Sequence, residues 1–508
     1  MGKISLPEDF HNYRVHFVGI KGTGMAALVE IFFSAGAVIT GSDVAERFYT
    51  DDILDALGIK ALSFSESNVT KGINLVVYSS AYKLDQNPDL IAAQKLGVPC
   101  ALYTEALGAY SERAFSAGVC GVHGKTSTTG LAGTILSELD LNAQVLAGSV
   151  INSFGKKCVY TSPAERSQGQ DAASKKFFVA ETCEYQRHFM AFCPRVILLT
   201  SVESDHQDYY PTFADIQAAF VDYICKLPQG GTLVYCADDA GAVETVQIAT
   251  KKRPDITLVP YGTKAAGPWR LEYRSVKDQK NNFWTEFLGE AFLRVPGKHE
   301  VLDACGAAAL CSCLLREVGK NPSDYIEQIK RGLEKFSGGK RRSEVTGHAK
   351  NSFGDDIVFV DDYGHHPTAV KTTLAGFRDF YSGKKIIVDF MSHTYSRTQA
   401  LLKEFAASFG SADTVILNKI YSSARENPAD FSITGKTLAD EAAKFHKDVH
   451  YKEEFDDAAA FGAEILSKKA GAEYPNGYLF VTMGAGDNWK VAKKIMEAGG
   501  LAIEGAEK

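Results

Sequence analysis

Residues 121–127 read Gly-Val-His-Gly-Lys-Thr-Ser, and this stretch decides the fold of the chain around it. The apolar run Ala117-Gly118-Val119 before it predicts a strand, and residues 131–139 after it predict a helix. A glycine-rich turn in this setting cradles phosphates with its backbone N–H groups, reaches the β and γ oxygens with its lysine and holds Mg²⁺ with its threonine. The standard loop has a glycine where this chain has Val119, so the loop is a shortened form. A chance surface turn is the alternative, which the flanking strand and helix disfavour.

A second glycine-rich turn lies near the N-terminus, at Gly22-Thr23-Gly24. With Met25-Ala26-Ala27 it fits the pattern G-x-G-x-x-A, after a predicted strand at residues 15–20 and before a helical pattern. Asp43 follows at about the distance at which a dinucleotide-binding fold places an acid for the ribose. Glycines let the backbone approach a phosphate, and a helix N-terminus favours negative charge. Taken alone, the turn indicates NAD, another diphosphate such as a UDP-sugar, or a turn that serves packing only.

The order of predicted strands and helices divides the chain into three α/β units. A length of 508 residues corresponds to about three domains at roughly 150 residues each. We place the units at residues 1–112, 113–338 and 339–508. Apolar runs that alternate with helical segments predict a parallel sheet. The clearest runs are residues 15–20, 73–78, 177–180, 196–200, 232–237, 357–360, 385–389, 414–418 and 478–482. Two polar stretches, residues 161–176 and 264–282, are expected to be surface loops.

Composition narrows the class of protein. Apolar residues make up 45% of the chain and charged residues 23%, which are ordinary globular values. A net charge of −7 argues against a chain that depends on broad nucleic-acid binding. The N-terminus has no apolar signal segment, and no stretch of 18 uncharged apolar residues occurs, so we expect neither export nor a membrane span. Ten scattered cysteines without a C-x-x-C pair indicate reduced thiols, and together these features predict a cytoplasmic protein.

Ten motifs, spread in order over nearly the whole chain, resemble those of the Mur ligases. They are HFVGIKGTGM (16–25), TGSD (40–43), SSA (79–81), GVHGKTSTT (121–129), VAE (179–181), ESDHQD (203–208), PGKH (296–299), KRR (340–342), DDYGHHP (361–367) and HTYSRT (393–398). Each is modest alone, but DDYGHHP together with the shortened phosphate-binding loop is highly specific. The chain is most similar to the alanine-adding branch of this family.

The resemblance implies an α/β architecture of three domains. These are a Rossmann-like N-terminal domain for a UDP-sugar, a central P-loop ATPase domain and a Rossmann-like C-terminal domain for an amino acid. It also implies a reaction of peptidoglycan precursor synthesis, in which ATP phosphorylates the carboxylate of UDP-N-acetylmuramate and the amino group of L-alanine attacks the acyl phosphate. Mg²⁺, with Mn²⁺ as a substitute, would neutralise charge on the transferring phosphoryl group. The implied partners are these three small molecules, with no nucleic acid and no membrane.

Site residues follow from the resemblance by position. The implied catalytic residues are Lys125, Glu181, His206 and Arg342. The implied metal ligands are Thr126, Glu181 and His206. The implied ATP-binding residues are Gly121, Val122, His123, Gly124, Lys125, Thr126, Ser127, His299, Asp303, Arg342 and Asp362. Those for the UDP-sugar are Gly22, Thr23, Gly24, Asp43 and Ser80, and those for the amino acid are Tyr363, His365 and Arg397. A histidine ligand is atypical for Mg²⁺, which prefers oxygen, so a structural hydrogen bond is the alternative for His206.

The chain departs from the family pattern at several positions. After Glu181 the family has Ala-Asp-Glu-Ser-Asp, whereas residues 182–186 read Thr-Cys-Glu-Tyr-Gln. Asn is replaced by Ser201 before the second metal motif and by Glu300 after His299, and Arg is replaced by Thr394. These changes affect the expected contacts with adenine and with the amino acid rather than the residues that bind phosphate and metal. Glu300 either contacts the adenine amino group or is a solvated residue at a helix start. Val221 occupies the place of a lysine that some relatives carbamylate.

Three other functions remain open at this stage. A muropeptide ligase would attach a recycled peptide instead of one amino acid, although the HTYSRT run favours single amino-acid addition. An NAD-dependent oxidoreductase would leave Gly124-Lys125-Thr126 unexplained. An inactive regulator that binds UDP-sugars would not need Lys125, Thr126, Glu181 and His206.

Overall fold

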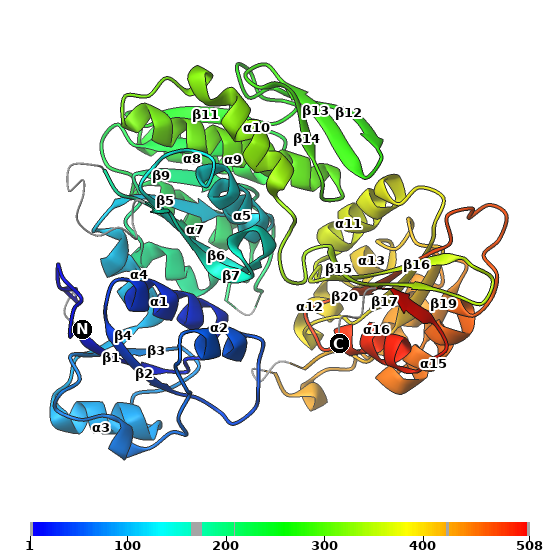
Figure 1. The fold of residues 1–508 in the computed structure, drawn as a ribbon, viewed down its shortest axis with the longest axis horizontal. Helices are drawn as coiled ribbons and strands as arrows, with labels where there is room; N and C mark the ends of the chain where they lie inside the picture. Colours follow the sequence, from blue (N-terminus) through cyan, green and yellow to red (C-terminus); the bar gives the residue numbers. More distant parts are fainter. Residues whose placement is uncertain (1–3, 164–174, 208, 423–425, 505–508) are drawn as a thin grey trace.

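Three α/β domains follow one another along the chain (Figure 1). A computed structural model describes residues 4–163, 175–207, 209–422 and 426–504. The first domain is blue in Figure 1, the central domain cyan to green, and the C-terminal domain yellow to red. The two predicted boundaries fall in connections between elements, one after α4 and one after α10, and the ligand of each domain stays a prediction.

The first domain is a small parallel sheet with helices packed on it. In residues 4–112 the sheet has four strands in the order β2-β1-β3-β4, which is a Rossmann-like arrangement. The strands are β1 (Arg14–Val18), β2 (Val38–Ser42), β3 (Leu75–Tyr78) and β4 (Cys100–Leu102). The helices are α1 (Thr23–Ser34), α2 (Thr50–Ala56), α3 (Pro88–Leu96) and α4 (Tyr103–Ser111), with the 3₁₀ turn η1 (Glu66–Asn68). The glycine-rich turn of residues 22–24 leads into α1.

The central domain is built on a larger, mainly parallel sheet. In its described residues the strand order is β11-β10-β9-β5-β8-β6-β7, and β7 runs antiparallel. These strands are β5 (Phe115–Cys120), β6 (Ala143–Ile151), β7 (Lys157–Thr161), β8 (Phe177–Glu181), β9 (Val196–Leu199), β10 (Thr232–Cys236) and β11 (Thr257–Tyr261). The helices are α5 (Lys125–Leu136), α7 (Phe213–Ile224), α8 (Ala240–Lys252), α9 (Lys298–Glu317) and α10 (Ile326–Lys335). Shorter 3₁₀ segments are η2 (Asn152–Phe154), η3 (Tyr185–Ala191) and η4 (Pro322–Tyr325).

The C-terminal domain has its own seven-stranded sheet within the residues described from 339 to 504, in the order β19-β18-β17-β20-β16-β15-β21. The strands are β15 (Glu344–Lys350), β16 (Asp356–Asp362), β17 (Lys385–Phe390), β18 (Thr414–Leu417), β19 (Val449–Tyr451), β20 (Tyr478–Met483) and β21 (Ala502–Glu504). The helices are α11 (Pro367–Phe380), α12 (Tyr395–Ala400), α13 (Leu402–Ala406), α14 (Gly435–Ala442), α15 (Phe455–Leu466) and α16 (Trp489–Glu497), with η5 (Pro428–Asp430). The strands from β19 to β16 are parallel, as a Rossmann-like domain requires.

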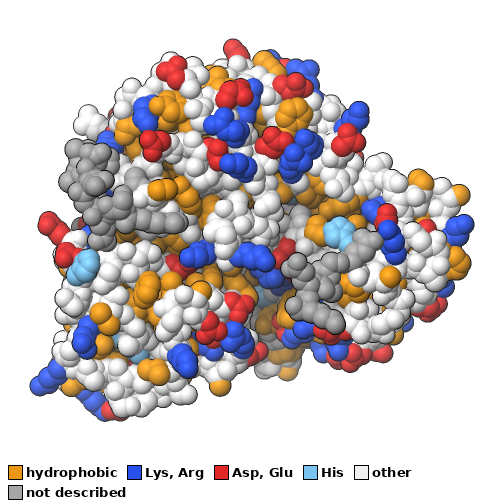
Figure 2. Space-filling model, in the orientation of Figure 1, with side chains coloured by type: hydrophobic (Ala, Val, Ile, Leu, Met, Phe, Trp, Pro, Cys, Tyr) orange, Lys and Arg blue, Asp and Glu red, His pale blue; other side chains and the backbone are white. Residues whose placement is uncertain are grey.

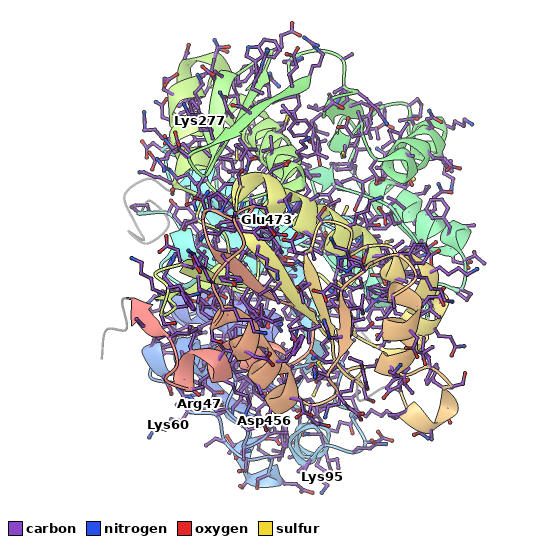
Figure 3. The ribbon with its side chains drawn as sticks, turned by 90° about the vertical axis from the view of Figure 1, so that its right-hand side faces the viewer. Arg47, Lys60, Lys95, Lys277, Asp456 and Glu473 are labelled. Atoms are coloured by element: carbon purple, nitrogen blue, oxygen red, sulfur yellow. The ribbon has the colours of Figure 1, made fainter. Side chains whose placement is uncertain are left out.

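One predicted loop is wrong. Residues 264–282 were expected to be irregular, but they contain β12 (Leu271–Lys277) and the start of β13 (Lys280–Thr285), which pair with β14 (Gly289–Leu293) in an antiparallel sheet. The turn Asp278-Gln279 has φ values of 51° and 52°, the left-handed conformation of a two-residue hairpin turn. Exposed Arg and Lys side chains on one face gave the hairpin the composition of a loop. Lys277 marks its end in Figure 3.

Several other expectations are settled by the structure. The ten cysteines, all among the described residues, are free thiols. No helix in the described part of the chain is long and apolar enough to cross a membrane. The helix after the phosphate-binding loop begins at Lys125, earlier than the predicted residue 131. Of the predicted loop at 161–176, residues 164–174 lie outside the described residues.

The first and central domains share one hydrophobic core. Phe32 of α1 and Tyr110 of α4 belong to the same buried cluster as Phe178 of β8. The rings of Tyr110 and Phe178 meet edge to face at 5.1 Å, and the Tyr110 hydroxyl donates a hydrogen bond of 2.7 Å to Oε1 of Gln144. Burial of this apolar surface fixes the first domain against β6 and β8.

Glu30 of α1 is a buried carboxyl group in the same interface, with 4% of its surface exposed. Burial raises its pKa from an ordinary 4.5 to about 7, and the charge of Lys157 and the amides of Cys158 and Val159 only partly oppose this shift. A folded-state pKa above the unfolded value means that the folded protein holds the proton more tightly. Glu30 therefore contributes stability at low pH that is lost as the pH rises from 4.5 through about 7.

We predict that Glu30→Gln removes this loss of stability with rising pH. In the wild type, Glu30 should lower the free energy of unfolding by about 1.4 kcal/mol per pH unit within that window. The thermal midpoint of the variant, measured from pH 5 to pH 8, should therefore fall less with rising pH than that of the wild type. The control is Glu66→Gln, on an exposed carboxylate paired with Lys95. Parallel curves for wild type and Glu30→Gln would contradict the prediction.

Candidate functional site

The loop at residues 121–127 joins β5 to α5 and is held tightly against the next strand of the sheet. Gly121 has a φ of 138°, and a Cβ there would lie 2.0 Å from Oγ1 of Thr200. Gly124 has a φ of 79° and is the residue before α5. Only glycine fits both positions, because each combines a positive φ with close packing. The loop therefore leads into the N-terminus of α5, whose first N–H groups form the arrangement that binds phosphate, while Val122 and His123 donate their N–H groups to Ser201 and fix the loop.

The side chain of Lys125 turns back over this loop and forms a buried ion pair. Its Nζ donates to Oε2 of Glu184 at 2.9 Å and to the backbone oxygen of Gly121 at 2.5 Å. Burial disfavours the charge on Lys125, but Glu184, together with smaller contributions from neighbours such as Glu181, outweighs burial and raises the pKa of the lysine. Lys125 is thus kept as a cation in the place where phosphate oxygens would arrive. Glu184 was not predicted as a site residue; as the acid retained in the altered 182–186 segment, it could have been noticed.

Thr126 and Glu181 lie together at the start of α5 and the end of β8. The Thr126 hydroxyl donates to Oε2 of Glu181 at 2.8 Å, and the N–H of Gly148 donates to the same oxygen at 2.8 Å. A Cβ on Gly148 would lie 2.4 Å from this carboxylate, so a side chain there would displace it. A hydroxyl and a carboxylate are the hard oxygen donors that Mg²⁺ prefers, and both fit that ion.

His206, the third predicted metal ligand, does not contact this pair directly. Its Nε2 lies 3.5 Å from Oε1 of Glu184, and its ring lies 4.7 Å from that of Tyr185. The backbone of His206 has a φ of 53°, an uncommon conformation for this residue type, and its N–H donates to Oδ1 of Asp205 at 2.7 Å. Glu184 therefore lies between Lys125 and His206 and links the phosphate-binding loop to the second motif.

Two buried acids of α9 lie beneath the loop. Glu300 accepts a hydrogen bond of 2.8 Å from the Ser127 hydroxyl, and a Cβ on Gly124 would lie 2.5 Å from Oδ1 of Asp303. Burial raises the pKa of both carboxyl groups, and the charge of Glu300 raises that of Asp303 further. The solvated alternative for Glu300 is therefore wrong, and an adenine contact stays a prediction. His299 lies beside Glu300, with 3.9 Å between Nε2 and Oε1.

The connection into the C-terminal domain carries Arg342. Its guanidinium lies 5.3 Å from the ring centre of Tyr363, and its charge acts on the buried Glu300 and Asp303. Asp362 accepts from the N–H groups of Ser343 and Gly364, both at 2.8 Å, and so fixes the turn after the connection. Arg342 is thus directed toward the nucleotide-binding loop.

Arg341 has a different environment from Arg342. Its guanidinium pairs with Asp361 at 2.7 Å and donates to the backbone oxygens of Gly484 and Gly486. It is a structural contact of the C-terminal domain rather than a free cation.

The three predicted amino-acid-binding residues lie around the junction of the central and C-terminal domains. The rings of Tyr363 and His365 are 5.1 Å apart, and burial lowers the pKa of His365 well below its usual value. Arg397 crosses the junction: its Nη2 and Nε donate to Oδ1 of Asp205 at 2.8 and 3.2 Å. Burial acts to raise the pKa of Asp205, but Arg397, together with the neighbouring His206 and His365, outweighs burial and lowers the pKa. On the face shown in Figure 2, Lys and Arg side chains lie where the domains meet.

A cavity of about 240 Å³ follows the first glycine-rich turn. It is lined by Gly22, Thr23, Gly24, Met25, Ser79, Ser80, Leu102, Tyr103, Thr104 and His188. Asp43 does not line this cavity. Its Oδ2 accepts a hydrogen bond of 2.7 Å from the N–H of Lys21, the residue before the turn, and so fixes the turn. The ribose role predicted for Asp43 therefore stays a prediction, while the glycines and Ser80 face the cavity.

A second cavity, of about 130 Å³, lies next to the first and is lined by residues of both the first and the central domain. Tyr103, Thr104 and His188 line both cavities, and Glu181 lines the second. The two cavities therefore lie side by side between the glycine-rich turn of the first domain and Glu181. His188 was missed by sequence reasoning, because nothing in its immediate neighbours distinguishes it from a surface histidine.

We predict that Asp205→Ala opens the junction between the central and C-terminal domains. Removing one partner of a buried ion pair leaves the other charge unpaired, at a cost of about 3–5 kcal/mol. Small-angle X-ray scattering of the ligand-free protein should show a larger radius of gyration for the variant. The control is Asp222→Ala, which breaks the more exposed pair with Arg187. An unchanged scattering curve for Asp205→Ala would show that other contacts close the junction.

Comparison with known proteins assigns the chain to a family. Three family models match in order: "Mur ligase family, catalytic domain" over residues 14–114, "Mur ligase middle domain" over 119–311 and "Mur ligase, glutamate ligase domain" over 341–486. The chain is 44% identical over 498 residues to the UDP-N-acetylmuramate–L-alanine ligase of Treponema pallidum (strain Nichols), covering 97% of this chain and 98% of that protein. It is 34% identical over 490 residues to that of Borreliella burgdorferi, covering 95% and 98%.

Solved structures agree on the fold. The UDP-N-acetylmuramate–alanine ligase of Thermotoga maritima aligns with a TM-score of 0.71 at 23% identity, covering 96% of this chain and 98% of that one. A murein peptide ligase of Psychrobacter arcticus aligns with a TM-score of 0.63 at 20% identity, with the same coverage. With family models matched in all three domains and full-length relatives above 30% identity, the chain belongs to the Mur ligase family.

Proposed function

We propose that this protein is an ATP-dependent ligase that joins L-alanine to the carboxylate of UDP-N-acetylmuramate through an acyl phosphate. The observation that carries the proposal is 44% identity, over 97% of the chain, to a protein named for this activity. The muropeptide alternative is not favoured, because the relatives that match above 30% identity carry the alanine-ligase name. An oxidoreductase would not require Lys125 and its ion pair.

The central domain supplies the phosphoryl-transfer machinery in this proposal. The loop amides and Lys125 bind the β and γ phosphates of ATP, and Lys125 exchanges its Glu184 contact for phosphate oxygens as the nucleotide arrives. Thr126 and Glu181 hold Mg²⁺, which neutralises charge on the transferring group. Arg342 reaches the same phosphates from the connection to the C-terminal domain and stabilises the developing charge.

The first domain holds the UDP-sugar so that its carboxylate enters the central domain. The glycine-rich turn and the N-terminus of α1 bind the diphosphate, beside Ser80. The second cavity leads from there to Glu181, so a sugar bound along both cavities brings its carboxylate to the phosphoryl group. His188, which lines both cavities, is the residue we add to this binding site.

The C-terminal domain delivers the amino acid. Arg397 leaves Asp205 and binds the carboxylate of the amino acid with its planar guanidinium. Tyr363 and His365 surround the side chain of the amino acid. His365 has a pKa well below its usual value, so it is neutral at pH 7 and adds no charge beside the attacking amine. We further propose a cytoplasmic location, where ATP is available, and no nucleic-acid partner.

The proposal is tested by measuring phosphate release with UDP-N-acetylmuramate, ATP and Mg²⁺ in the presence of alanine, serine, glycine or a muramyl tripeptide. We expect alanine to be the best acceptor. Lys125→Ala should lower turnover on the order of 10²-fold or more, because it removes a cation from the developing phosphoryl charge, while UDP-sugar binding by calorimetry stays unchanged. Preference for the tripeptide would overturn the assignment, and full turnover by Lys125→Ala would overturn the ATP site.

We also predict a change in pH dependence for Glu184→Gln. Burial alone lowers the pKa of Lys125 and the Glu184 carboxylate raises it, so the variant should lose the lysine charge at a lower pH. The fall in kcat/KM on the alkaline side should therefore move to lower pH. Glu244→Gln, on the exposed surface of α8, is the control. An alkaline limb at the wild-type position would contradict the role of Glu184.

A further inference from the structure

Three metal-ligating side chains meet between the phosphate-binding loop and the C-terminal domain. His123 belongs to the loop, Glu203 follows β9, and His366 is the residue before α11. One ligand atom from each lies within 4.8 Å of the others. Nε2 of His123 is 3.6 Å from Oε2 of Glu203, and Nδ1 of His366 is 3.9 Å from the same oxygen. None of the three belongs to the Thr126–Glu181 pair proposed for Mg²⁺.

Both imidazoles have nitrogen atoms without hydrogen-bond partners. Nε2 of His123 and Nε2 of His366 are buried and make no hydrogen bond within the described residues; the former faces Oε2 of Glu203 at 3.6 Å. Nδ1 of His366 accepts a hydrogen bond of 3.4 Å from the N–H of Thr368, so Nε2 is the donor atom of this ring that is left for a ligand. The His366 side chain is only 8% exposed. Buried polar atoms in native proteins are nearly always satisfied, and an ion is one of the partners that explains an exception. The cluster therefore has imidazole nitrogens that no protein group occupies and that can coordinate a metal ion.

Neighbouring groups already hold the three side chains in place. The Thr368 hydroxyl donates to Oε2 of Glu203 at 3.0 Å. The backbone of His123 is held on both sides, because its N–H donates to Oγ of Ser201 at 2.9 Å and its oxygen accepts from Oγ1 of Thr200 at 2.5 Å. Outer hydrogen bonds of this kind orient ligands in metal sites.

We propose that His123, Glu203 and His366 form a Zn²⁺ site that bridges the central and C-terminal domains. Two imidazoles and one carboxylate are a frequent ligand set for Zn²⁺, with water in the fourth position, whereas Mg²⁺ prefers oxygen donors. Ligands at about 2.0–2.2 Å from Zn²⁺ stand roughly 3.5 Å apart, so closure needs only a small contraction of the cluster. The bound ion joins the phosphate-binding loop to the start of α11. Zn²⁺ thus holds the two domains together and inhibits turnover, which requires them to separate and exchange ligands.

The test is a titration of the full-length, nucleotide-free protein with Zn²⁺ alone, competed against a chromogenic chelator. Wild type should bind one Zn²⁺. Loss of an outer hydrogen bond weakens metal binding about 10–100-fold, and Glu203→Gln and His366→Ala should each weaken it by more than this, because each removes a ligand. His450→Ala, which removes a partly exposed imidazole paired with Asp448, should bind like wild type. Co²⁺ in the site should give the intense visible absorption of a four-coordinate nitrogen–oxygen environment.

Three outcomes would overturn the proposal. They are no Zn²⁺ binding by wild type, equal affinity in wild type, Glu203→Gln and His366→Ala, or loss of the ion in Glu181→Gln instead. Glu203→Gln keeps an acceptor for Thr368, so it remains informative if His366→Ala fails to fold. Anomalous scattering at the zinc edge from soaked crystals would locate the ion directly.

Discussion

The buried pair of Lys125 and Glu184 is the interaction on which the arrangement of the site depends. A phosphate-binding loop needs a lysine without bulk water around it, and a buried ammonium without a partner would lose its proton. Glu184 holds the charge in place until phosphate replaces the carboxylate. Such a pair adds little net stability, because desolvation offsets the attraction. Its role is to position the segment after β8 over the loop, where Glu184 also lies 3.5 Å from His206 of the segment after β9.

Each of the other two domains meets this loop from a different side. The first domain lines most of one cavity and, with the central domain, a second cavity that includes Glu181, and the C-terminal domain contributes Arg342 and Arg397. The central domain therefore holds the phosphate-binding loop, and the site residues of the other two domains lie around it. The parts of the candidate site are distributed between domains, as in enzymes whose substrates are enclosed on binding.

Much of the fold could be predicted from the sequence, because its buried strands are short runs of β-branched and aromatic residues. Residues 177–180, 385–389 and 478–482 were located almost to the residue in this way. The hairpin of β12 and β13 was not, because its exposed face is charged and its turn lacks the usual glycine.

The site was only partly predictable. Motifs identify residues that are close in sequence to a glycine-rich turn, such as Lys125 and Thr126. Glu184 was open to notice only as the acid retained in the altered 182–186 segment, and His188 has no such signal; the importance of both comes from contacts across more than fifty residues. Of the two alternatives for Glu300, the solvated one is wrong: a charged residue at a helix start is usually exposed, whereas this one is buried and accepts a hydrogen bond from Ser127.

The continuous core between the first and central domains has a consequence for how the chain folds. Elements that share one buried cluster gain and lose their packing together, so the first domain and the face of the central sheet that packs on it should unfold as one cooperative unit. The other face of the central sheet has a cluster of its own, and the C-terminal domain has two further clusters, one of which Val276 of β12 contacts. During synthesis, the ribosome would thus release a unit that completes its core before the last third of the chain emerges, and the final domain would dock onto a finished surface.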